Sequence, residues 1–297
     1  PELFLLKLML AYIVILRDQG KDVTTFHYDV KCAFPNAPLD EKIALKFPKG
    51  FSEAIFGDER FMELSGSLYG LKQSAANWEK CLNELLDKLK FKPSEVALCL
   101  RIKSVNGHLT LLLVQVDDIA GLTTDPTEAE NLLKEMRSKW TVRNLGELSA
   151  FLNLEIDQNV DDNIIHLHST IATQKALDEL GLSSVRPRSA PAQHKFDYHE
   201  KANGEVLCAR DITKYQRIVG VALWFSRTTV PTALKAVGSL SQYSARPTAA
   251  LMEAAVHLCG YIKAKGELGM LFSIDRLEPN CPIATRVRAD SNSKFAP

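Results

Sequence analysis

The sequence carries no excess of charge, because its 36 lysine and arginine residues balance 36 aspartate and glutamate residues. Binding to nucleic acid through net charge alone is therefore excluded, and such a partner would require a local groove or bound cations. Long hydrophobic runs are also missing. The apolar stretch from Phe4 to Leu16 contains Lys7 and is shorter than a membrane span of about 20 residues. With no signal peptide recognisable, we expect an intracellular protein, cytoplasmic or nuclear, with no membrane partner.

Cysteine is sparse and scattered, since the six cysteines stand singly and no CxxC pair occurs. This spacing argues against a zinc site or a disulfide framework, and indicates free thiols in a reducing compartment. Internal repeats and low-complexity tracts are absent as well. What the chain does have is 297 residues, of which 46% are hydrophobic. That is enough for about two compact units with sizeable cores, and it excludes wholesale disorder.

Hydrophobic periodicity predicts an α+β fold followed by a helical region and the beginning of a β-rich part. Asn106-Gly107 between two strand-like runs is a strong hairpin signal. Helices are expected at 4–16, 75–89 and 127–139, and in two or three pieces across 215–264 broken near Pro231 and Pro247. Strands are expected at 26–31, 43–51 (with a turn at Pro48 and Gly50), 96–102, 108–116, 119–124, 151–157, 163–169, 270–274 and 285–290.

The most unusual stretch is LLLVQVDDIAGL, in which Asp117 and Asp118 interrupt an otherwise apolar strand signal. Two carboxylates about 4 Å apart repel by ~4 kcal/mol at an effective dielectric constant of 20. A raised pKa on one carboxyl or a bound divalent cation relieves this repulsion, and hard oxygen ligands suit Mg²⁺ or Mn²⁺. By itself the pair is more often an ordinary turn. A third carboxylate, Asp29, stands inside another predicted strand, so the three together predict a site for two metal ions.

Several motifs in order resemble the reverse transcriptases of copia-type retrotransposons. They are YDVKCAFPNAPLDEKIALKFPKGF from Tyr28, SLYGLKQSAANW from Ser67, VQVDDIAG around the paired carboxylates, and WTVRNLGELSAFLNLEI from Trp140. Two later stretches, YQRIVGVALWFSRTTVP and LSQYSARPTAALMEAAVHLCGYIKAKGELGM, resemble the helical region that follows in this family. The resemblance implies an RNA-directed DNA polymerase with a right-hand palm, an antiparallel sheet with helices on one face.

The resemblance also implies a domain organisation. The expected parts are a palm at 1–182 with primer-grip strands and incomplete fingers, a linker or exposed loop at 183–210, a helical thumb and connection region at 211–280, and the truncated start of an RNase H-like domain at 281–297. In that last part Asp290 would be the first metal-binding aspartate. The partners implied are an RNA template, a DNA primer or RNA–DNA hybrid, and deoxynucleoside triphosphates, in a cytoplasmic particle or the nucleus.

Roles for single residues follow from the same resemblance. Asp29 and Asp117 would be the principal ligands of two Mg²⁺ or Mn²⁺ ions, together with the backbone of Val30, and Asp118 the supporting carboxylate. Phe34 would exclude a ribose 2′-hydroxyl, and Lys72 and Gln73 would contact the incoming nucleotide. The residues expected at the primer and template are Gln115, Val116, Phe151, Leu152 and Asn153.

The sequence departs from the family pattern at several of these positions. Gln115 replaces a tyrosine, Asn153 replaces a glycine, and Ala75-Ala76 replace Pro-Arg. Pro35 follows Phe34, so we expect Phe34 to be held in an extended or polyproline conformation. Apolar core positions are kept while the departures fall at expected substrate contacts.

Three alternatives remain open on the sequence alone. The first is a catalytically inert, truncated remnant of a retroelement. The second is a metal-dependent phosphodiesterase or nuclease that uses the same carboxylates. The third is simple cation binding by Asp117-Asp118 and by Asp161-Asp162. His166 and His168 alternate on one strand and could bind a metal, although an exposed strand pair is the commoner meaning of that pattern.

Overall fold

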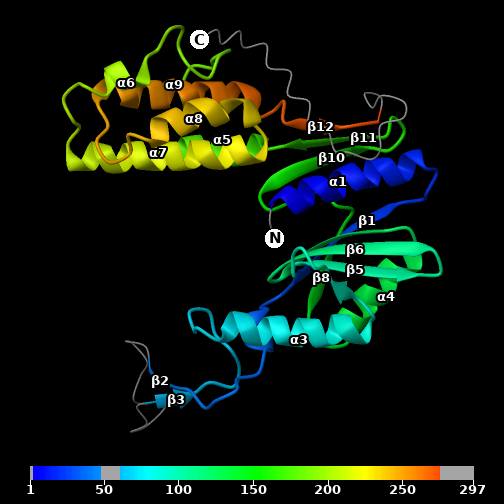
Figure 1. The fold of residues 1–297 in the computed structure, drawn as a ribbon. Coiled ribbons are helices and arrows are strands. Elements are labelled where there is room, and N and C mark those ends of the chain that lie inside the picture. Colours follow the sequence, from blue (N-terminus) through cyan, green and yellow to red (C-terminus); the bar gives the residue numbers. More distant parts are fainter. Residues whose placement is uncertain (1–2, 48–60, 275–297) are drawn as a thin grey trace. The chain divides into compact units, whose positions relative to one another are not determined.

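The computed structural model describes residues 3–47 and 61–274, and the chain divides into two compact units (Figure 1). The first unit comprises residues 1–9 and 19–148, and the second comprises residues 10–18 and 149–297. Helix α1 (Leu3–Asp18) is shared between them, and Gly20 follows it with a positive φ of 73°. Glycine just after a helix adopts this left-handed conformation without strain. The helix predicted at 4–16 is thus confirmed.

The first unit is built on a six-stranded antiparallel sheet in the order β4-β5-β6-β7-β1-β8. Its strands are β1 (Thr24–Val30), β4 (Lys92–Pro93), β5 (Leu100–Val105), β6 (His108–Gln115), β7 (Asp118–Thr123) and β8 (Val142–Gly146). The predicted Asn106-Gly107 hairpin is confirmed, with positive φ at both residues as a type I′ turn requires. Strand β5 begins at Leu100 rather than Val96, because residues 97–100 form a turn in which the Leu100 N–H donates to the Ala97 carbonyl. A separate hairpin pairs β2 (Ala44–Lys46) with β3 (Phe61–Glu63).

Helices α3 (Ser74–Lys88) and α4 (Pro126–Arg137) pack on the sheet of the first unit, as predicted for 75–89 and 127–139 (Figure 1). Alternate residues of β1, namely Phe26, Tyr28 and Val30, enter the same hydrophobic core as these helices. Asp125 caps α4 by accepting a hydrogen bond from the Thr127 N–H at 3.0 Å. Because strand side chains alternate between faces, the intervening residues of β1 lie on the face away from α3 and α4.

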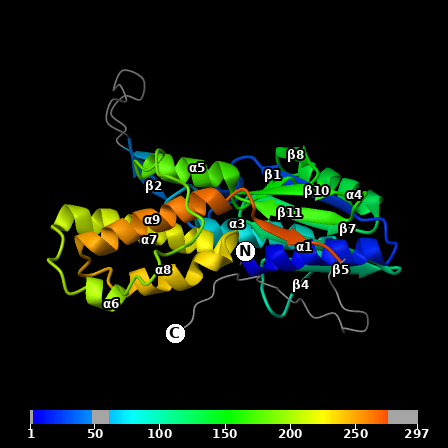
Figure 2. The ribbon, with the colours of Figure 1, turned by 90° about the horizontal axis from the view of Figure 1, so that it is seen from above.

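The second unit combines a four-stranded antiparallel sheet, β12-β11-β10-β9, with a helical part. Helices α7, α8 and α9 bury a common apolar core, and Figure 2 shows them lying alongside one another. The strands are β9 (Ala150–Phe151), β10 (Leu154–Asn159), β11 (Ile164–His168) and β12 (Met270–Phe272). The helices are α5 (Thr170–Glu179), α6 (Tyr198–Lys201), α7 (Ala209–Thr228), α8 (Leu234–Ser241) and α9 (Ala249–Lys265), with a 3-10 turn η2 (Pro231–Ala233).

The breaks predicted near Pro231 and Pro247 separate these helices, and the α+β class with antiparallel sheets is confirmed. The segment 183–210, expected to be a linker or loop, contacts α9 within the second unit. Lys263 Nζ donates to the Ser183 carbonyl at 2.6 Å, and the Arg188 N–H donates to the Gly260 carbonyl at 3.0 Å. The turn expected at Pro48 and Gly50 and the strand expected at 285–290 lie outside the described residues. Within 3–47 and 61–274, no helix has the length and apolar character needed to cross a membrane.

Candidate active site

The candidate site in the first unit lies at one end of neighbouring strands of its sheet. Asp29 on β1 pairs directly with Asp118 on β7, and Asp118 pairs with Gln115 on β6. On the other side Asp29 pairs with Arg143 on β8. These four residues form a cross-strand row, on the sheet face away from α3 and α4. The sheet register therefore brings together residues from three segments of the chain, around positions 29, 115–118 and 143.

Asp117 sits next to this row, in the two-residue turn between β6 and β7. The Val30 N–H donates to the Asp117 carbonyl at 2.8 Å, which fastens the turn to the end of β1. The other turn residue, Val116, has a φ of 58°. A β-branched side chain is strained in that region, and such strain costs of order 1–3 kcal/mol. The two-residue turn thus reverses the chain with backbone strain at Val116, and it places Asp117 beside Asp29 and Val30.

Trp78 of α3 holds the same turn from the helix side. Its indole Nε1–H donates to the Val116 carbonyl at 2.7 Å. The Trp78 side chain is 2% exposed and packs edge-on against Trp140, with ring centroids 4.8 Å apart. A buried, rigid donor on a core helix therefore fixes the position of the turn that carries Asp117.

Like charges directly opposite each other destabilise an antiparallel pair, and Asp29 and Asp118 are such a pair. Two basic side chains partly compensate. His27 Nε2 is in contact with Asp118 Oδ1, and the His27 side chain is almost fully buried. Arg143 Nη1 lies 3.9 Å from Asp29 Oδ2, with about two thirds of its side chain exposed. The carboxylates of Asp29 and Asp118 stay about one third exposed, so they remain accessible to solutes.

Phe34, expected to contact the nucleotide sugar, follows β1 closely in the chain. Its ring packs against Tyr69 with centroids 4.7 Å apart. Burial first, and then the negative charges of Asp117, Cys32 and Asp29, raise the pKa of Tyr69 above its ordinary value. The aromatic pair of Phe34 and Tyr69 therefore lies within electrostatic range of the aspartates.

The expectation that Pro35 keeps Phe34 extended is wrong, because Phe34 begins the 3-10 helix η1 (Phe34–Asn36). Proline disfavours a helical conformation in the residue before it without forbidding it. In the first turn of a helix the missing proline N–H costs nothing, since that group has no partner there anyway. The Ala37 N–H closes the turn on the Phe34 carbonyl at 2.9 Å.

Lys72 and Gln73, expected at the incoming nucleotide, lie at the start of α3. Gln73 is the residue that precedes the helix, and its Nε2 donates to Glu41 Oε1 at 3.2 Å. Lys72 is exposed to solvent. Ala75 and Ala76, which replace Pro-Arg of the family pattern, are exposed in the first turn of α3.

The residues expected at the primer or template fall into two groups. Gln115 and Val116 belong to the β6–β7 hairpin of the first unit and are exposed. Phe151, Leu152 and Asn153 belong to the second unit, where Leu152 and Asn153 form the β9–β10 turn with φ of 55° and 62°. Asparagine tolerates the left-handed conformation, so Asn153 preserves a turn in which the family has glycine. Asp290 lies outside the described residues.

The donor set of the site fits a hard divalent cation, because Asp29, Asp117 and Asp118 offer carboxylate oxygens with partial solvent access. Among the described residues, the group of three potential ligands whose atoms all lie within 4.8 Å of one another is Asp157, His166 and His168, and it does not include these aspartates. A site for two ions about 3.5–4 Å apart spreads its ligands more widely than a single-ion site.

In the turn at Asp161-Asp162, the Asp162 carboxylate accepts a hydrogen bond from Asn159 Nδ2 at 2.7 Å.

Four neighbours of the aspartates were not identified from the sequence as parts of the site: His27, Tyr69, Trp78 and Arg143. His27 could have been found by strand alternation, since it lies two residues before Asp29 on β1 and so on the same strand face. Arg143 belongs to the cross-strand row, but its strand β8 was not predicted from the sequence. The roles of Tyr69 and Trp78 depend on where the 67–78 segment folds, and no periodicity in the sequence carries that information.

Comparison with known proteins identifies the family of the chain. A sequence model of the family described as reverse transcriptase (RNA-dependent DNA polymerase) matches residues 2–194. The transposon Ty5-1 protein of Saccharomyces cerevisiae is 30% identical over 235 residues, which is 79% of this chain and 74% of that protein. The retrovirus-related Pol polyprotein from transposon TNT 1-94 of Nicotiana tabacum is 22% identical over 252 residues, and that from transposon RE1 of Arabidopsis thaliana is 27% identical over 236 residues. The matches cover 82% and 79% of this chain and only 18% and 16% of the two polyproteins. The chain therefore belongs to the reverse transcriptase (RNA-dependent DNA polymerase) family, in the branch carried by copia-type retrotransposons.

Proposed function

We propose that this chain carries the nucleotidyl-transfer centre of an RNA-directed DNA polymerase, with Asp29, Asp117 and Asp118 as its carboxylates. The observation that supports this most directly is the sheet register, which opposes Asp29 to Asp118 while the Val30 N–H holds the Asp117 carbonyl. Three carboxylates at the end of adjacent strands repel one another and destabilise the fold when no cation is near. Bound cations would offset this repulsion.

Two Mg²⁺ or Mn²⁺ ions, if bound at such a site, would supply Lewis acidity toward a primer 3′-hydroxyl and positive charge toward a nucleoside triphosphate. Within the chain, Asp29 and Asp117 with the backbone of Val30 would hold the ions, and Asp118 would support them from its place opposite Asp29. The contact between His27 and Asp118 orients that carboxylate and occupies one of its oxygens. Trp78 fixes the turn so that Asp117 does not have to be repositioned when the substrate binds.

The substrates proposed are deoxynucleoside triphosphates and a DNA primer on an RNA template. The ring of Phe34, backed by Tyr69, forms a flat wall against which a sugar without a 2′-hydroxyl can rest. Lys72 and Gln73 at the start of α3 would meet the phosphates, since the N-terminal end of a helix favours anions. Phe151, Leu152 and Asn153 would hold the primer end, Gln115 and Val116 would contact the primer or template, and Asp290 would belong to an RNase H-like domain.

Primer extension on an RNA template with Mg²⁺ or Mn²⁺ tests the proposal. We expect Asp29→Asn and Asp117→Asn each to reduce extension by about 100-fold or more, because each removes a charge that acts on the transition state. Asp161→Asn is the matched control, since Asp161 is an exposed aspartate on the β10–β11 turn. Wild-type extension no greater than that of Asp117→Asn would show a catalytically inert remnant. Metal-dependent shortening of the primer or template that these variants abolish would instead show a nuclease.

A further inference from the structure

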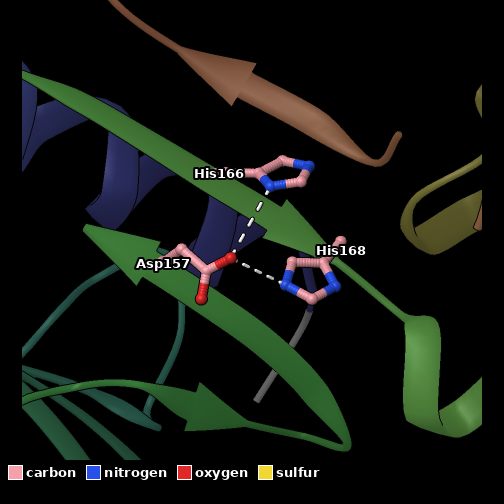
Figure 3. Close-up of side chains that lie close together, drawn as sticks. All are labelled: Asp157, His166 and His168. Carbon is pink, nitrogen blue, oxygen red and sulfur yellow. Dashed lines mark hydrogen bonds and ion pairs between the residues drawn. The ribbon is translucent and has the colours of Figure 1, made fainter. Parts of the chain in front are cut away.

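A second cluster of potential metal ligands lies on the sheet of the second unit. The proposed polymerase function assigns no role to it. Asp157 projects from β10, and His166 and His168 project from β11 (Figure 3). We call these three residues the two-histidine cluster. Their ligand atoms all lie within 4.8 Å of one another. We propose that this cluster binds a divalent transition-metal ion, with zinc as the ion that its ligand set favours.

The spacing of the cluster matches a tetrahedral ion. Asp157 Oδ2 lies 3.0 Å from His168 Nε2 and 3.7 Å from His166 Nδ1, as the dashed lines in Figure 3 mark. Zinc bonds to nitrogen and oxygen ligands at about 2.0–2.2 Å, which places tetrahedral ligand atoms about 3.3 Å apart. The two observed distances fall on either side of that value. Small side-chain rotations therefore suffice to seat an ion between the three atoms.

The hydrogen bonds around His166 leave the nitrogen that faces Asp157 available as a ligand. His166 Nε2 lies 3.0 Å from the carbonyl of Leu268, and a carbonyl only accepts, so Nε2 carries the proton. In the neutral ring the lone pair is then on Nδ1, which faces Asp157. Metal-binding histidines characteristically donate their other N–H to a carbonyl or carboxylate in this way.

His168 has the same kind of support on its far side. Its Nδ1 lies 2.8 Å from Thr170 Oγ1 and 3.8 Å from Glu155 Oε2. In the structure His168 Nε2 forms a hydrogen bond with the Asp157 carboxylate at 3.0 Å, and a carboxylate only accepts, so Nε2 carries the proton. A bound ion would take the place of that proton on Nε2, and a proton on Nδ1 would then be directed to Thr170 Oγ1 and Glu155 Oε2. Glu155 Oε1 accepts a hydrogen bond from the Ile171 N–H at 3.0 Å, so the Glu155 carboxylate is held in place.

Glu155, next to His168, supplies a further indication of a cation. Its Oε2 is buried, and no hydrogen-bond partner for it occurs among the described residues. An unpaired buried carboxylate oxygen is costly unless positive charge lies near it. An ion bound by His168 would make the Nδ1–H of that ring a stronger donor toward Glu155. The ion would thereby strengthen the ion pair between His168 Nδ1 and Glu155 Oε2, whose atoms lie 3.8 Å apart.

The chemistry of the cluster selects a different metal from the one suited to the aspartate site. Two imidazole nitrogens and one carboxylate oxygen favour zinc and similar borderline ions over Mg²⁺. The Asp157 side chain is largely exposed, so water completes the coordination and the ion exchanges with solvent. Bound there, the ion would join β10 to β11, and through His166 to the Leu268 carbonyl next to β12. The proposal concerns binding in the second unit and does not depend on polymerase activity.

Isothermal titration of the whole chain with ZnCl₂, in excess MgCl₂ to occupy the hard-oxygen sites, tests the proposal. We expect one zinc equivalent, with affinity reduced at least about 10-fold in His166→Gln and in His168→Gln. His199→Gln on α6 is the matched control, since His199 is exposed and distant from the cluster in the sequence, and it should bind as the wild type does. Substitution of Co²⁺ adds a spectrum, in which intense visible bands without thiolate charge transfer indicate nitrogen and oxygen ligands rather than cysteine.

Two outcomes would overturn the proposal. One is a wild-type chain that takes up no zinc under these conditions. The other is undiminished binding by the His166→Gln and His168→Gln variants, which would leave the cluster as a hydrogen-bonded His–Asp pair on a strand surface. Asp157→Asn guards against misfolding of the histidine variants, because it preserves side-chain size and removes only the charge. It is expected to weaken zinc binding at least about 10-fold while its circular dichroism spectrum stays that of the wild type.

Discussion

Replacing Trp78 by phenylalanine isolates the hydrogen bond that holds the β6–β7 turn. The change removes the indole N–H that donates to the Val116 carbonyl at 2.7 Å. A hydrogen bond of this kind contributes about 1 kcal/mol net, and shrinking a buried tryptophan costs about 2 kcal/mol more in packing. We therefore expect Trp78→Phe to lower the free energy of unfolding by about 3 kcal/mol.

The matched control is Trp140→Phe. Trp140 is 9% exposed and packs edge-on against Trp78, so its truncation carries a similar packing cost without breaking the bond to Val116. The control should lose about 2 kcal/mol, which leaves a difference of about 1 kcal/mol for the hydrogen bond. Urea denaturation of the two variants measures that difference.

The loss of the hydrogen bond also has a local consequence at the β6–β7 turn. Val116, with its φ of 58°, stores strain of order 1–3 kcal/mol, comparable with the bond that would be lost. Without that bond, local opening of the turn should increase by about 5-fold, since the bond contributes about 1 kcal/mol and about 1.4 kcal/mol is a factor of ten. The Val30 amide, which donates to the Asp117 carbonyl, should exchange its hydrogen correspondingly faster in Trp78→Phe than in Trp140→Phe. Primer extension should fall by a similar factor in kcat. Equal amide exchange and equal kcat in the two variants would refute a positioning role for Trp78.

Three further changes probe the same unit. Val116→Gly should raise the free energy of unfolding by about 1 kcal/mol in urea denaturation, because relief of 1–3 kcal/mol of strain exceeds the 0.5–1 kcal/mol entropic cost of glycine; a loss of stability would argue against strain at this turn. Phe34→Ala should reduce discrimination between deoxy- and ribonucleotides by about 10-fold or more in single-nucleotide extension, and unchanged discrimination would remove Phe34 from that role. Tyr28→Phe should cost about 1 kcal/mol near neutral pH, because the Tyr28 hydroxyl donates to the Ala129 carbonyl at 2.9 Å. Burial raises the pKa of Tyr28 from its ordinary value of 10.0 to about 12, so the advantage of the wild type is complete below pH 10 and is lost as the pH rises through about 12. Stability curves of the two proteins that stay parallel from pH 8 to 12 would contradict this.

The departures from the family pattern differ in how they affect the structure. Asn153 preserves a left-handed turn position, and Pro35 is accommodated in a 3-10 turn, so neither disturbs the backbone near its site. Gln115 is exposed at the end of β6, next to Asp118 in the cross-strand row, where it changes only what a primer or template would touch. These substitutions therefore alter contact surfaces and leave the scaffold of the aspartates in place.

Local sequence determined most of the secondary structure, because the periodicity of apolar residues in a strand or helix can be recognised within a few neighbouring residues. The Asn106-Gly107 turn, the breaks near Pro231 and Pro247, and the helices α1, α3 and α4 were all predicted from such signals. Strands β3 and β8 and helix α5 were not predicted from the sequence. Elsewhere the observed structure differs from the prediction where a distant or competing contact decides. Leu100 turns back on Ala97 before β5 begins, and Phe34 enters a helical turn although proline follows it.

The sequence predicted which carboxylate residues make up the candidate site. It did not predict the residues that hold those carboxylates in position. Strand signals and carboxylates indicated Asp29, Asp117 and Asp118 because uncompensated charge within apolar strands is costly and therefore informative. Only the tertiary structure decided that Asp29 opposes Asp118, that Trp78 holds the strained turn, and that Leu268 and Glu155 support the histidines of a separate cluster. The physical reason is that register and long-range hydrogen bonds join segments whose separation along the chain leaves no periodic trace in the sequence.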